Sequence, residues 1–371
     1  MKIAIICGSL EQGKDGVGDY SLRLAKALVS QGQQISLVAL NDFHTTNTIE
    51  TNIISGTSQI CVMRLPALLA EKEKFKKLKK FIDSVNPDWI SLQFVPYSFH
   101  KKGMPFGLAH RLLSVGGQSK WHIMYHELWI GINSKTISFK NRIVRAIQRR
   151  VIHRINAVLK PACITTSIPL YTNELKAYNS KLLPLFGNIP IAETTNETQL
   201  GNLKEISVIH FGSFTSFFDE LEHQFRVIKE IAVRTNRRIK FFVLGDSGSF
   251  KLEALTLAEK IFEASSIVSI GRLPESEISG YMLHADLGIS RADYVYYGKS
   301  GSTIAMLEHG LPVVLRGKAP GHKILSQDPH FLNDQLFFCD DSLKSLPQKK
   351  TPNYLSVENI AKKMIGYLSN S

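Results

Sequence analysis

Short apolar runs alternate with longer amphipathic segments along most of the chain. Apolar runs occur at Lys2–Cys7 and Gln34–Leu40, whereas Asp19–Gln31 repeats its apolar side chains at helical spacing. This order predicts strand, helix, strand, with a first loop over Gly8–Gly18 that contains four glycines. Further strands are expected at 60–63, 89–94, 121–125 and 162–165.

A second series of the same kind follows a polar stretch at 192–201, which we interpret as a linker. Strands are predicted at 206–211, 240–245, 267–270, 287–290 and 312–315. Helices are predicted at 220–235, 252–264, 274–284 and 301–309, and a last amphipathic helix at 357–368. Alternating strands and helices indicate an α/β protein. We therefore expect two successive α/β domains, at 1–190 and 191–350.

Composition narrows the class of protein. The 371 residues are 44% hydrophobic, which is enough apolar surface to exclude a disordered chain. The four cysteines are far apart and show no metal-ligand spacing, so no metal site is expected. No apolar run approaches the ~18–20 residues of a membrane span, and the N-terminal apolar run is too short for a signal peptide. We expect a reduced, cytoplasmic protein.

The net charge of +13 belongs to the first half of the chain. Residues 1–190 contain 25 Lys and Arg against 11 Asp and Glu, and residues 128–173 contain no acidic residue. Ile143, Ile147, Val151, Ile155 and Val158 recur at helical spacing among those cations. Such a helix either packs its apolar face on its own domain or rests on an anionic membrane surface. Nucleic acid is disfavoured, because no zinc-finger spacing or aromatic cluster accompanies the charge.

The first candidate site lies in the first loop, because open α/β sheets bind ligands at the carboxyl ends of their strands. Gly16 and Gly18 stand where a strand gives way to a helix, and small residues with free amides there favour an anion. A flexible loop in which Asp19 caps the helix explains the same residues equally well.

A second candidate site follows the strand at 121–125. His126 and Glu127 could transfer protons or bind sugar hydroxyls there, and Trp129 could offer a stacking surface. The two polar residues are adjacent, so on an extended backbone they point to opposite sides and do not form one acid–base pair. A structural histidine is the alternative interpretation.

A third candidate site spans the entry to the helix at 301–309. Gly301, Ser302 and Thr303 offer amides and hydroxyls to a diphosphate, with Ser300 directly before them. Arg291 and Lys299 could add positive charge. Plain N-capping by Ser300 or Ser302 explains the hydroxyls, but not their number beside two cations.

Together these segments resemble the glycosyltransferases of family 4, whose GT-B architecture consists of two facing Rossmann-like domains. The similarity extends almost from end to end of the chain. It rests on the following segments, which occur in the same order as in the family: Gly16-Val17-Gly18-Asp19-Tyr20-Ser21, Tyr125-His126-Glu127-Leu128-Trp129, Thr165-Thr166-Ser167, Asn188-Ile189-Pro190, His210-Phe211-Gly212-Ser213-Phe214 and Gly310-Leu311-Pro312-Val313-Val314.

The resemblance implies transfer of a sugar from a nucleotide-sugar donor with retention of configuration and without a metal or other cofactor. It implies a first domain that binds a glycan or lipid-linked acceptor, with Asp19, Glu127 and Trp129 on that side. His126 would lie near the transferred sugar, in a cleft between the domains. The donor residues would be Gly16, Gly18, Gly212, Ser213, Arg272, Leu273 and the third candidate site. The segment 351–371 would form a helix that returns to the first domain.

The sequence departs from the family pattern at two places. Many members carry two glutamates before the Gly-Leu-Pro segment, and Tyr297 and Ala305 occupy those positions here. The Arg/Lys pair expected after the first strand of the second domain is also absent from 212–218. Two functions follow: a variant transferase acting in cell-surface polysaccharide assembly, or a catalytically silent GT-B protein that binds a nucleotide, a glycan or a partner enzyme.

Overall fold

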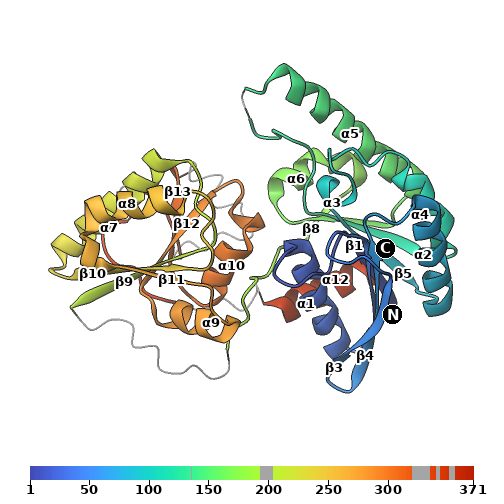
Figure 1. Cartoon of the computed structure of the whole chain (residues 1–371), viewed down its shortest axis with the longest axis horizontal. Coiled ribbons are helices and arrows are strands. Elements are labelled where there is room, and N and C mark those ends of the chain that lie inside the picture. Colours follow the sequence, from blue (N-terminus) through green and yellow to red (C-terminus); the bar gives the residue numbers. More distant parts are fainter. Residues whose placement is uncertain (135, 193–203, 320–334, 340–342, 351–355) are drawn as a thin grey trace. The chain divides into compact units, whose positions relative to one another are not determined.

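A computed structural model describes residues 1–134, 136–192, 204–319, 335–339, 343–350 and 356–371. The chain forms two compact units (Figure 1). Unit 1 comprises Met1–Leu183 and Val357–Ser371, and unit 2 comprises Pro184–Ser356. The expected linker at 192–201 lies, except for Ala192, outside the described residues.

Unit 1 is built on one sheet, sheet A, in the order β3-β4-β2-β1-β5-β6-β7-β8. Its strands are β1 (Lys2–Cys7), β2 (Gln34–Asp42), β3 (Ile49–Ser55), β4 (Ser58–Pro66), β5 (Trp89–Phe94), β6 (Lys120–Tyr125), β7 (Cys163–Thr166) and β8 (Lys181–Leu182). Its helices are α1 (Gly16–Ser30), α2 (Glu71–Val85), α3 (Pro96–Phe99), α4 (Leu108–Gly116), α5 (Phe139–Leu159), α6 (Pro169–Glu174) and α12 (Val357–Ser369), with a 3₁₀ turn at Lys176–Tyr178.

Sheet A is parallel except for β3, which pairs antiparallel with β4. Figure 1 shows α1 and α12 on one face of the sheet and α2, α4 and α5 on the other. Every residue of β5 is buried, as expected for a central parallel strand that is covered on both faces. The last helix packs against α1, where Gln31 Nε2 donates to the Glu358 carbonyl at 2.7 Å. Tyr367 also donates its hydroxyl to the Leu182 carbonyl at 3.0 Å.

Unit 2 is built on sheet B, in the order β11-β10-β9-β12-β13-β14, and all of its pairings are parallel. Its strands are β9 (Glu205–Phe211), β10 (Arg238–Leu244), β11 (Ile267–Gly271), β12 (Leu287–Asp293), β13 (Val313–Arg316) and β14 (Leu336–Phe337). Its helices are α7 (Phe218–Arg234), α8 (Lys251–Phe262), α9 (Glu275–His284) and α10 (Gly301–Glu308), with 3₁₀ turns at Ala264–Ser266 and Tyr297–Lys299.

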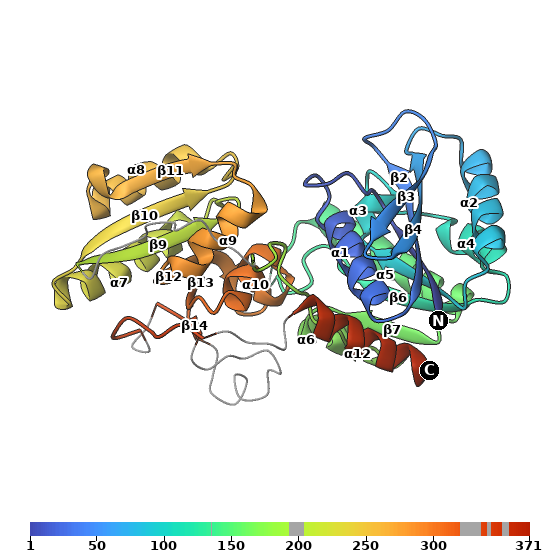
Figure 2. The same ribbon diagram turned by 90° about the horizontal axis from the view of Figure 1, so that it is seen from below.

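Helices cover both faces of sheet B (Figures 1 and 2), and an apolar layer lies between the helices and the sheet on each face. On one face, Phe225 of α7 and Phe262 of α8 pack on Phe241 of β10, with ring centroids 4.9–5.8 Å apart. On the other face, α9 and α10 cover the sheet with side chains such as Met282 and Leu307. Helices on both faces of a parallel sheet give the Rossmann-like architecture.

The structure corrects the expected start of one helix, adds one strand, and shows how far the apolar stripe of α5 is covered. Helix α1 begins at Gly16 instead of Asp19. Strand β3, which the sequence analysis missed, forms an exposed hairpin with β4. The predicted apolar stripe of α5 is only partly covered, because Val151 and Ile155 are buried whereas Ile143 is 47% exposed.

Candidate functional site

The chain order of sheet A reverses beside β1. After β1 the chain adds β2, β4 and β3 on one side, and then β5, β6, β7 and β8 on the other. Ligands of open α/β sheets bind outside the carboxyl ends of the strands at such a switch point. The ends of β5 and β6 meet there, because the His126 amide donates to the Phe94 carbonyl at 3.0 Å.

Asp15 caps α1, so the expected cap at Asp19 is wrong. The Asp15 carboxylate accepts from the amides of Val17 at 2.9 Å and Gly18 at 2.8 Å. Asp19 instead accepts from the Gly13 amide at 3.0 and 3.2 Å, and burial raises its pKa. The Gly18 amide is therefore already bonded to a carboxylate of the chain itself.

Gly18 and Gly16 have different surroundings, although both start α1. A Cβ at Gly18 would come within 2.4 Å of the Ser9 carbonyl oxygen, whereas nothing lies within 4 Å of a Cβ at Gly16. Gly18 is therefore required for packing of the first loop on the helix. Gly16 adjoins open space that a ligand can use.

We expect Gly18→Ala to lower the free energy of unfolding of unit 1 by about 1–3 kcal/mol, because the carbonyl it meets belongs to the backbone. Gly16→Ala, the matched control, is expected to be neutral or to stabilise by roughly 0.4–1 kcal/mol. Tryptophan fluorescence in guanidinium chloride measures both, since Trp89, Trp121 and Trp129 all belong to unit 1. Equal stability of the two variants would contradict the packing requirement.

An ion-pair cluster that the sequence analysis missed fixes the first loop to the end of β2. Asp42 is fully buried and accepts from Arg64 Nε at 2.7 Å and from Ser9 Oγ at 3.0 Å. Arg64 also contacts the Glu11 carboxylate at 2.5 Å. Burial raises the pKa of Asp42, but the bonds from Arg64, from the His44 and Leu10 amides and from Ser9 outweigh burial and lower that pKa below its ordinary value.

His126 begins a chain of buried hydrogen bonds that crosses β5, β6 and β7. Its Nε2 lies 2.9 Å from Gln93 Oε1, and Gln93 Nε2 donates to Ser91 Oγ at 2.8 Å. Ser91 Oγ lies 2.8 Å from His122 Nδ1, and His122 Nε2 lies 2.9 Å from Thr165 Oγ1. All five side chains are at most 6% exposed.

The direction of the chain determines which nitrogens carry protons. The Thr165 hydroxyl donates a hydrogen bond to Met124 Sδ at 3.0 Å, so its oxygen accepts a hydrogen bond from His122 Nε2. His122 Nδ1 then accepts from Ser91. Burial lowers the pKa of His122 to about 3, which keeps this ring neutral. His126 donates from Nε2 to an amide oxygen, and in its neutral form Nδ1 is the nitrogen with the lone pair.

The other residues after β6 are placed differently. Glu127 is half-buried, whereas Trp129 is only 7% exposed. The Arg149 guanidinium lies over the Trp129 ring at 5.0 Å from its centroid. Trp129 therefore packs against α5 and does not present an open stacking surface. On the side of His126, the Tyr20 ring meets the imidazole edge to face at 4.9 Å.

The chain order of sheet B reverses between β9 and β12, and four loop segments meet there. Gly212 has φ +107°, and a Cβ on it would lie 3.3 Å from Ser302 Oγ at the start of α10. A Cβ on Gly248, after β10, would lie 3.0 Å from the Cβ of Ser213. The Gly245 amide donates to the carbonyl of Gly271 at the end of β11, at 2.7 Å. The structure thus brings Gly212, Ser213 and Ser302 together.

Hydroxyl groups at the start of α10 bond to one another. Ser300 caps the helix by accepting from the Thr303 amide at 3.3 Å, and it also accepts from Thr303 Oγ1 at 2.8 Å. Ser290 Oγ lies 2.6 Å from Thr303 Oγ1, and Ser302 Oγ lies 3.1 Å from Ser300 Oγ. Thr303 is buried, whereas Gly301 and Ser302 are half-buried. Within the described residues, no acceptor bonds to the amides of Gly301 and Ser302.

Two cations are adjacent in the chain to members of this hydroxyl cluster, Arg291 to Ser290 and Lys299 to Ser300. Arg291 lies within β12, which extends to Asp293, so it does not follow the strand as expected. Its side chain is exposed, and its charge adds to the burial that lowers the pKa of His210 to about 4. Lys299 ends the 3₁₀ turn directly before Ser300 and is half-buried. Lys299 therefore directly precedes the start of α10, whereas Arg291 lies near His210 of β9.

The residues after β11 lie at the same edge of sheet B. Arg272 pairs with Asp246, at 2.8 Å, and both side chains are more than 70% exposed. Leu273 is partly buried and packs against the core on the α9 side. An exposed pair of this kind contributes little to stability, so Arg272 can exchange Asp246 for another anion.

The two positions at which the resemblance to family 4 would place glutamates are closed. Tyr297 and Ala305 are buried, and a Cβ on Gly187 would come within 2.5 Å of the Ala305 Cα. Glu308, the nearest carboxylate along α10, accepts from the Gly187 amide at 2.9 Å. Glu308 therefore holds the segment around Gly187 on α10.

Arg316 is a cation that the sequence analysis missed, although it directly follows an expected strand. Its guanidinium lies 3.8 Å from the centroid of the Phe217 ring in the loop after β9. It contacts Asp293 at 3.1 Å and Glu220 at 3.5 Å. Arg316 thus supplies positive charge near the place where the family's Arg/Lys pair is absent, with two carboxylates already beside it.

No protein-family model matches the sequence, and no curated protein matches it. Solved structures do match over the whole length. Sucrose-phosphate synthase from Thermosynechococcus elongatus is similar at a TM-score of 0.57 and 15% identity, with 100% of this chain and 90% of that chain covered. The chain has the GT-B fold.

Two further solved structures show how widely this fold is used. Anabaena Alr3699/HepE, in complex with UDP and glucose, gives a TM-score of 0.52 at 13% identity, with 100% and 91% of the chains covered. UDP-GlcNAc 2-epimerase from Methanocaldococcus jannaschii gives 0.55 at 12% identity, with both chains covered completely. At these identities the likeness establishes the fold alone. No group of three or more potential metal ligands occurs among the described residues.

Proposed function

We propose that the protein is a retaining, metal-independent glycosyltransferase. In this proposal unit 2 holds the nucleotide-sugar donor, and unit 1 holds a glycan or glycolipid acceptor. His126 acts at the reacting sugar. The enzyme acts in the cytoplasm, at the inner face of the membrane, in the assembly of cell-surface polysaccharides.

One observation carries the proposal: amides, hydroxyls and cations converge at the switch point of sheet B. Gly212 and Ser302 approach one another there, Lys299 directly precedes the start of α10, and Arg291 directly follows Ser290, whose hydroxyl contacts Thr303 of that helix. A nucleoside diphosphate gains negative charge as the bond to its sugar breaks, so groups of this kind stabilise the transition state. Binding of UDP and glucose by the similar HepE structure is consistent with this use.

Tyr297 and Ala305 support the alternative that the protein is catalytically silent. Both are buried where the family carries carboxylates, and the segment around Gly187 covers Ala305. A protein that has the phosphate-binding groups but lacks those carboxylates would bind a nucleotide sugar without transferring the sugar, so no free nucleotide would be formed. The two functions therefore differ in turnover.

The proposal is tested by incubating the protein with UDP-, GDP- and ADP-sugars and candidate acceptors, and measuring the free nucleotide that is released. We expect release with one donor, unchanged by EDTA, and a product with the anomeric configuration of the donor. Arg291→Ala and Lys299→Ala are each expected to weaken binding of that nucleotide about tenfold, as for a hydrogen bond to a charged group. Arg226→Ala, an exposed arginine of α7, is the matched control.

Three outcomes would contradict parts of the proposal. Nucleotide binding without release from any donor favours the silent protein. Unchanged nucleotide affinity in both Arg291→Ala and Lys299→Ala removes these cations from the donor site. Loss of turnover in EDTA that added metal restores would refute the metal-independent reaction.

A further inference from the structure

One apolar stripe runs along α5 from a fully open end to a fully buried end. Phe139, Ile143, Ile147, Val151 and Ile155 are spaced four residues apart, so each is a neighbour of the next on the helix surface, and the row turns around the helix by about 40° at each step. Phe139 is 77% exposed and Ile143 47%, whereas Val151 is 7% and Ile155 1% exposed. The stripe therefore passes from solvent into the interior of unit 1.

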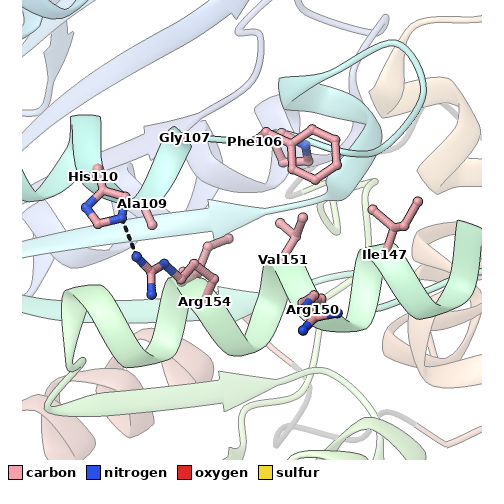
Figure 3. A pocket seen from close by; sticks show the side chains of 10 residues that line it. Phe106, Gly107, Ala109, His110, Ile147, Arg150, Val151 and Arg154 are labelled. Carbon is pink, nitrogen blue, oxygen red and sulfur yellow. Dashed lines mark hydrogen bonds between the residues drawn. The ribbon is translucent and has the colours of Figure 1, made fainter.

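A groove opens where the stripe becomes buried. It lies between α5 and residues 105–110, has a volume of about 390 Å³, and is walled mainly by apolar groups. Figure 3 shows Ile147 and Val151 pointing from α5 toward the ring of Phe106, which is 62% exposed. The volume lies within the range of ligand-binding pockets, and the apolar walls suit a hydrocarbon.

Cations line the same groove. Arg150 and Arg154 occupy successive turns of α5, and Arg154 Nη2 donates to His110 Nε2 at 2.9 Å (Figure 3). Glu127 is the one acidic residue in the sequence from 89 to 173, against twelve Lys and Arg. An anion at the groove therefore meets an excess of positive charge.

We propose that this groove binds one acyl chain of an anionic phospholipid, whose phosphate contacts Arg150 and Arg154. Exposed apolar side chains beside clustered cations are the features that bring a helix to an anionic membrane surface. Phe139 and Ile143 extend the apolar surface beyond the groove, so the acyl chain of the lipid would follow apolar side chains from the bilayer to the groove. Among the described residues, no helix has both the length and the apolar character needed to cross a membrane.

This inference rests on the membrane contact in the proposed function, but it needs no sugar transfer. Binding to phosphatidylglycerol vesicles without nucleotide therefore tests it separately from the reaction. Arg150→Gln/Arg154→Gln is expected to weaken binding about tenfold to thirtyfold, at ~1 kcal/mol for each cation near the surface. Lys76→Gln/Lys80→Gln on α2 removes the same charge at the same spacing from exposed positions, and we expect it to change affinity less than threefold.

Contact with the acyl chain is tested by placing a fluorophore at the groove. Phe106→Trp is expected to be quenched by vesicles whose phosphatidylglycerol carries brominated acyl chains. Phe43→Trp, an exposed aromatic position on another loop of unit 1, is expected to keep its emission. The native tryptophans contribute little to the difference, since each is at most 7% exposed.

Several results would overturn the inference. Equal quenching at positions 106 and 43, equal affinity for phosphatidylglycerol and phosphatidylcholine vesicles, or equal losses in the two double variants would each refute a lipid site in the groove. Concentration-dependent self-association that the Arg150→Gln/Arg154→Gln variant abolishes would identify a second copy of the chain as the occupant. Tighter binding of an acidic peptide than of vesicles would identify a protein partner.

Discussion

Replacing His126 with alanine is expected to lower the rate of sugar transfer about a hundredfold or more, as for the loss of a group that moves a proton in the reaction. The affinity for the donor nucleotide is expected to stay within about twofold. His126 belongs to unit 1, whereas the proposed nucleotide-binding groups belong to unit 2. The variant therefore separates the chemical step from donor binding.

The buried chain of hydrogen bonds gives His126 a defined role in that step. Gln93 Oε1 accepts a hydrogen bond from His126 Nε2, so the neutral ring carries its proton on Nε2 and its lone pair on Nδ1. Gln93 is held in turn by Ser91 and His122. We expect Gln93 to act as a positioning residue, which selects the tautomer and the orientation of the imidazole.

Gln93→Leu tests the positioning role. Nitrogen-15 NMR is expected to show His126 protonated at Nε2 in the natural protein and as a mixture of tautomers in the variant, with a lower kcat and an unchanged nucleotide affinity. Gln93→Glu keeps an acceptor and is expected to restore the Nε2–H tautomer. His153→Ala, a histidine of α5 bonded to Tyr178, is the control for turnover. A fully active His126→Ala, or an unchanged tautomer in Gln93→Leu, would contradict these roles.

The sequence predicts the buried elements well for a physical reason. Strand β5 is buried on both faces because helices cover both sides of sheet A, and its apolar residues, interrupted only by Ser91 and Gln93, are enough to give its bounds. Strand β3 has no such signal. It is an exposed edge strand with the sequence Ile-Glu-Thr-Asn-Ile-Ile-Ser, and only its antiparallel pairing with β4 makes it a strand.

The candidate sites were less predictable, because long-range contacts decide what each polar group does. The sequence correctly places His126 directly after a strand and Ser302 in the first turn of a helix, but it does not show that Gln93 bonds to His126 or that Ser302 approaches Gly212. The same limit applies to Glu308. Its position, three residues after Ala305, does not match the family's glutamate, and only the structure shows that it bonds to the Gly187 amide instead.

We expect Arg64→Leu to lower the free energy of unfolding of unit 1 by about 3 kcal/mol at pH 7, because it leaves the Asp42 carboxylate buried without its cation. The loss is expected to depend on pH. The pKa of Asp42 is lowered in the folded protein, so its stabilising contribution is present above the unfolded pKa of roughly 3.9 and is lost as the pH falls through the folded pKa.

The Arg64→Leu variant is expected to raise the pKa of Asp42 relative to the natural protein. Arg64 makes the largest of the contributions that lower the pKa of Asp42, so without it burial raises that pKa relative to the natural protein. Asp42 then takes up a proton at a higher pH, and the difference in stability between the two proteins shrinks as the pH falls from 8 to 4. Denaturation followed by tryptophan fluorescence at pH 4 to 8 measures this. Lys79→Leu, which breaks an exposed pair with Asp83, is expected to cost less than about 1 kcal/mol at every pH. A loss in Arg64→Leu that is small, or that stays constant between pH 4 and 8, would show that the Asp42–Arg64 pair does not hold the first loop in place.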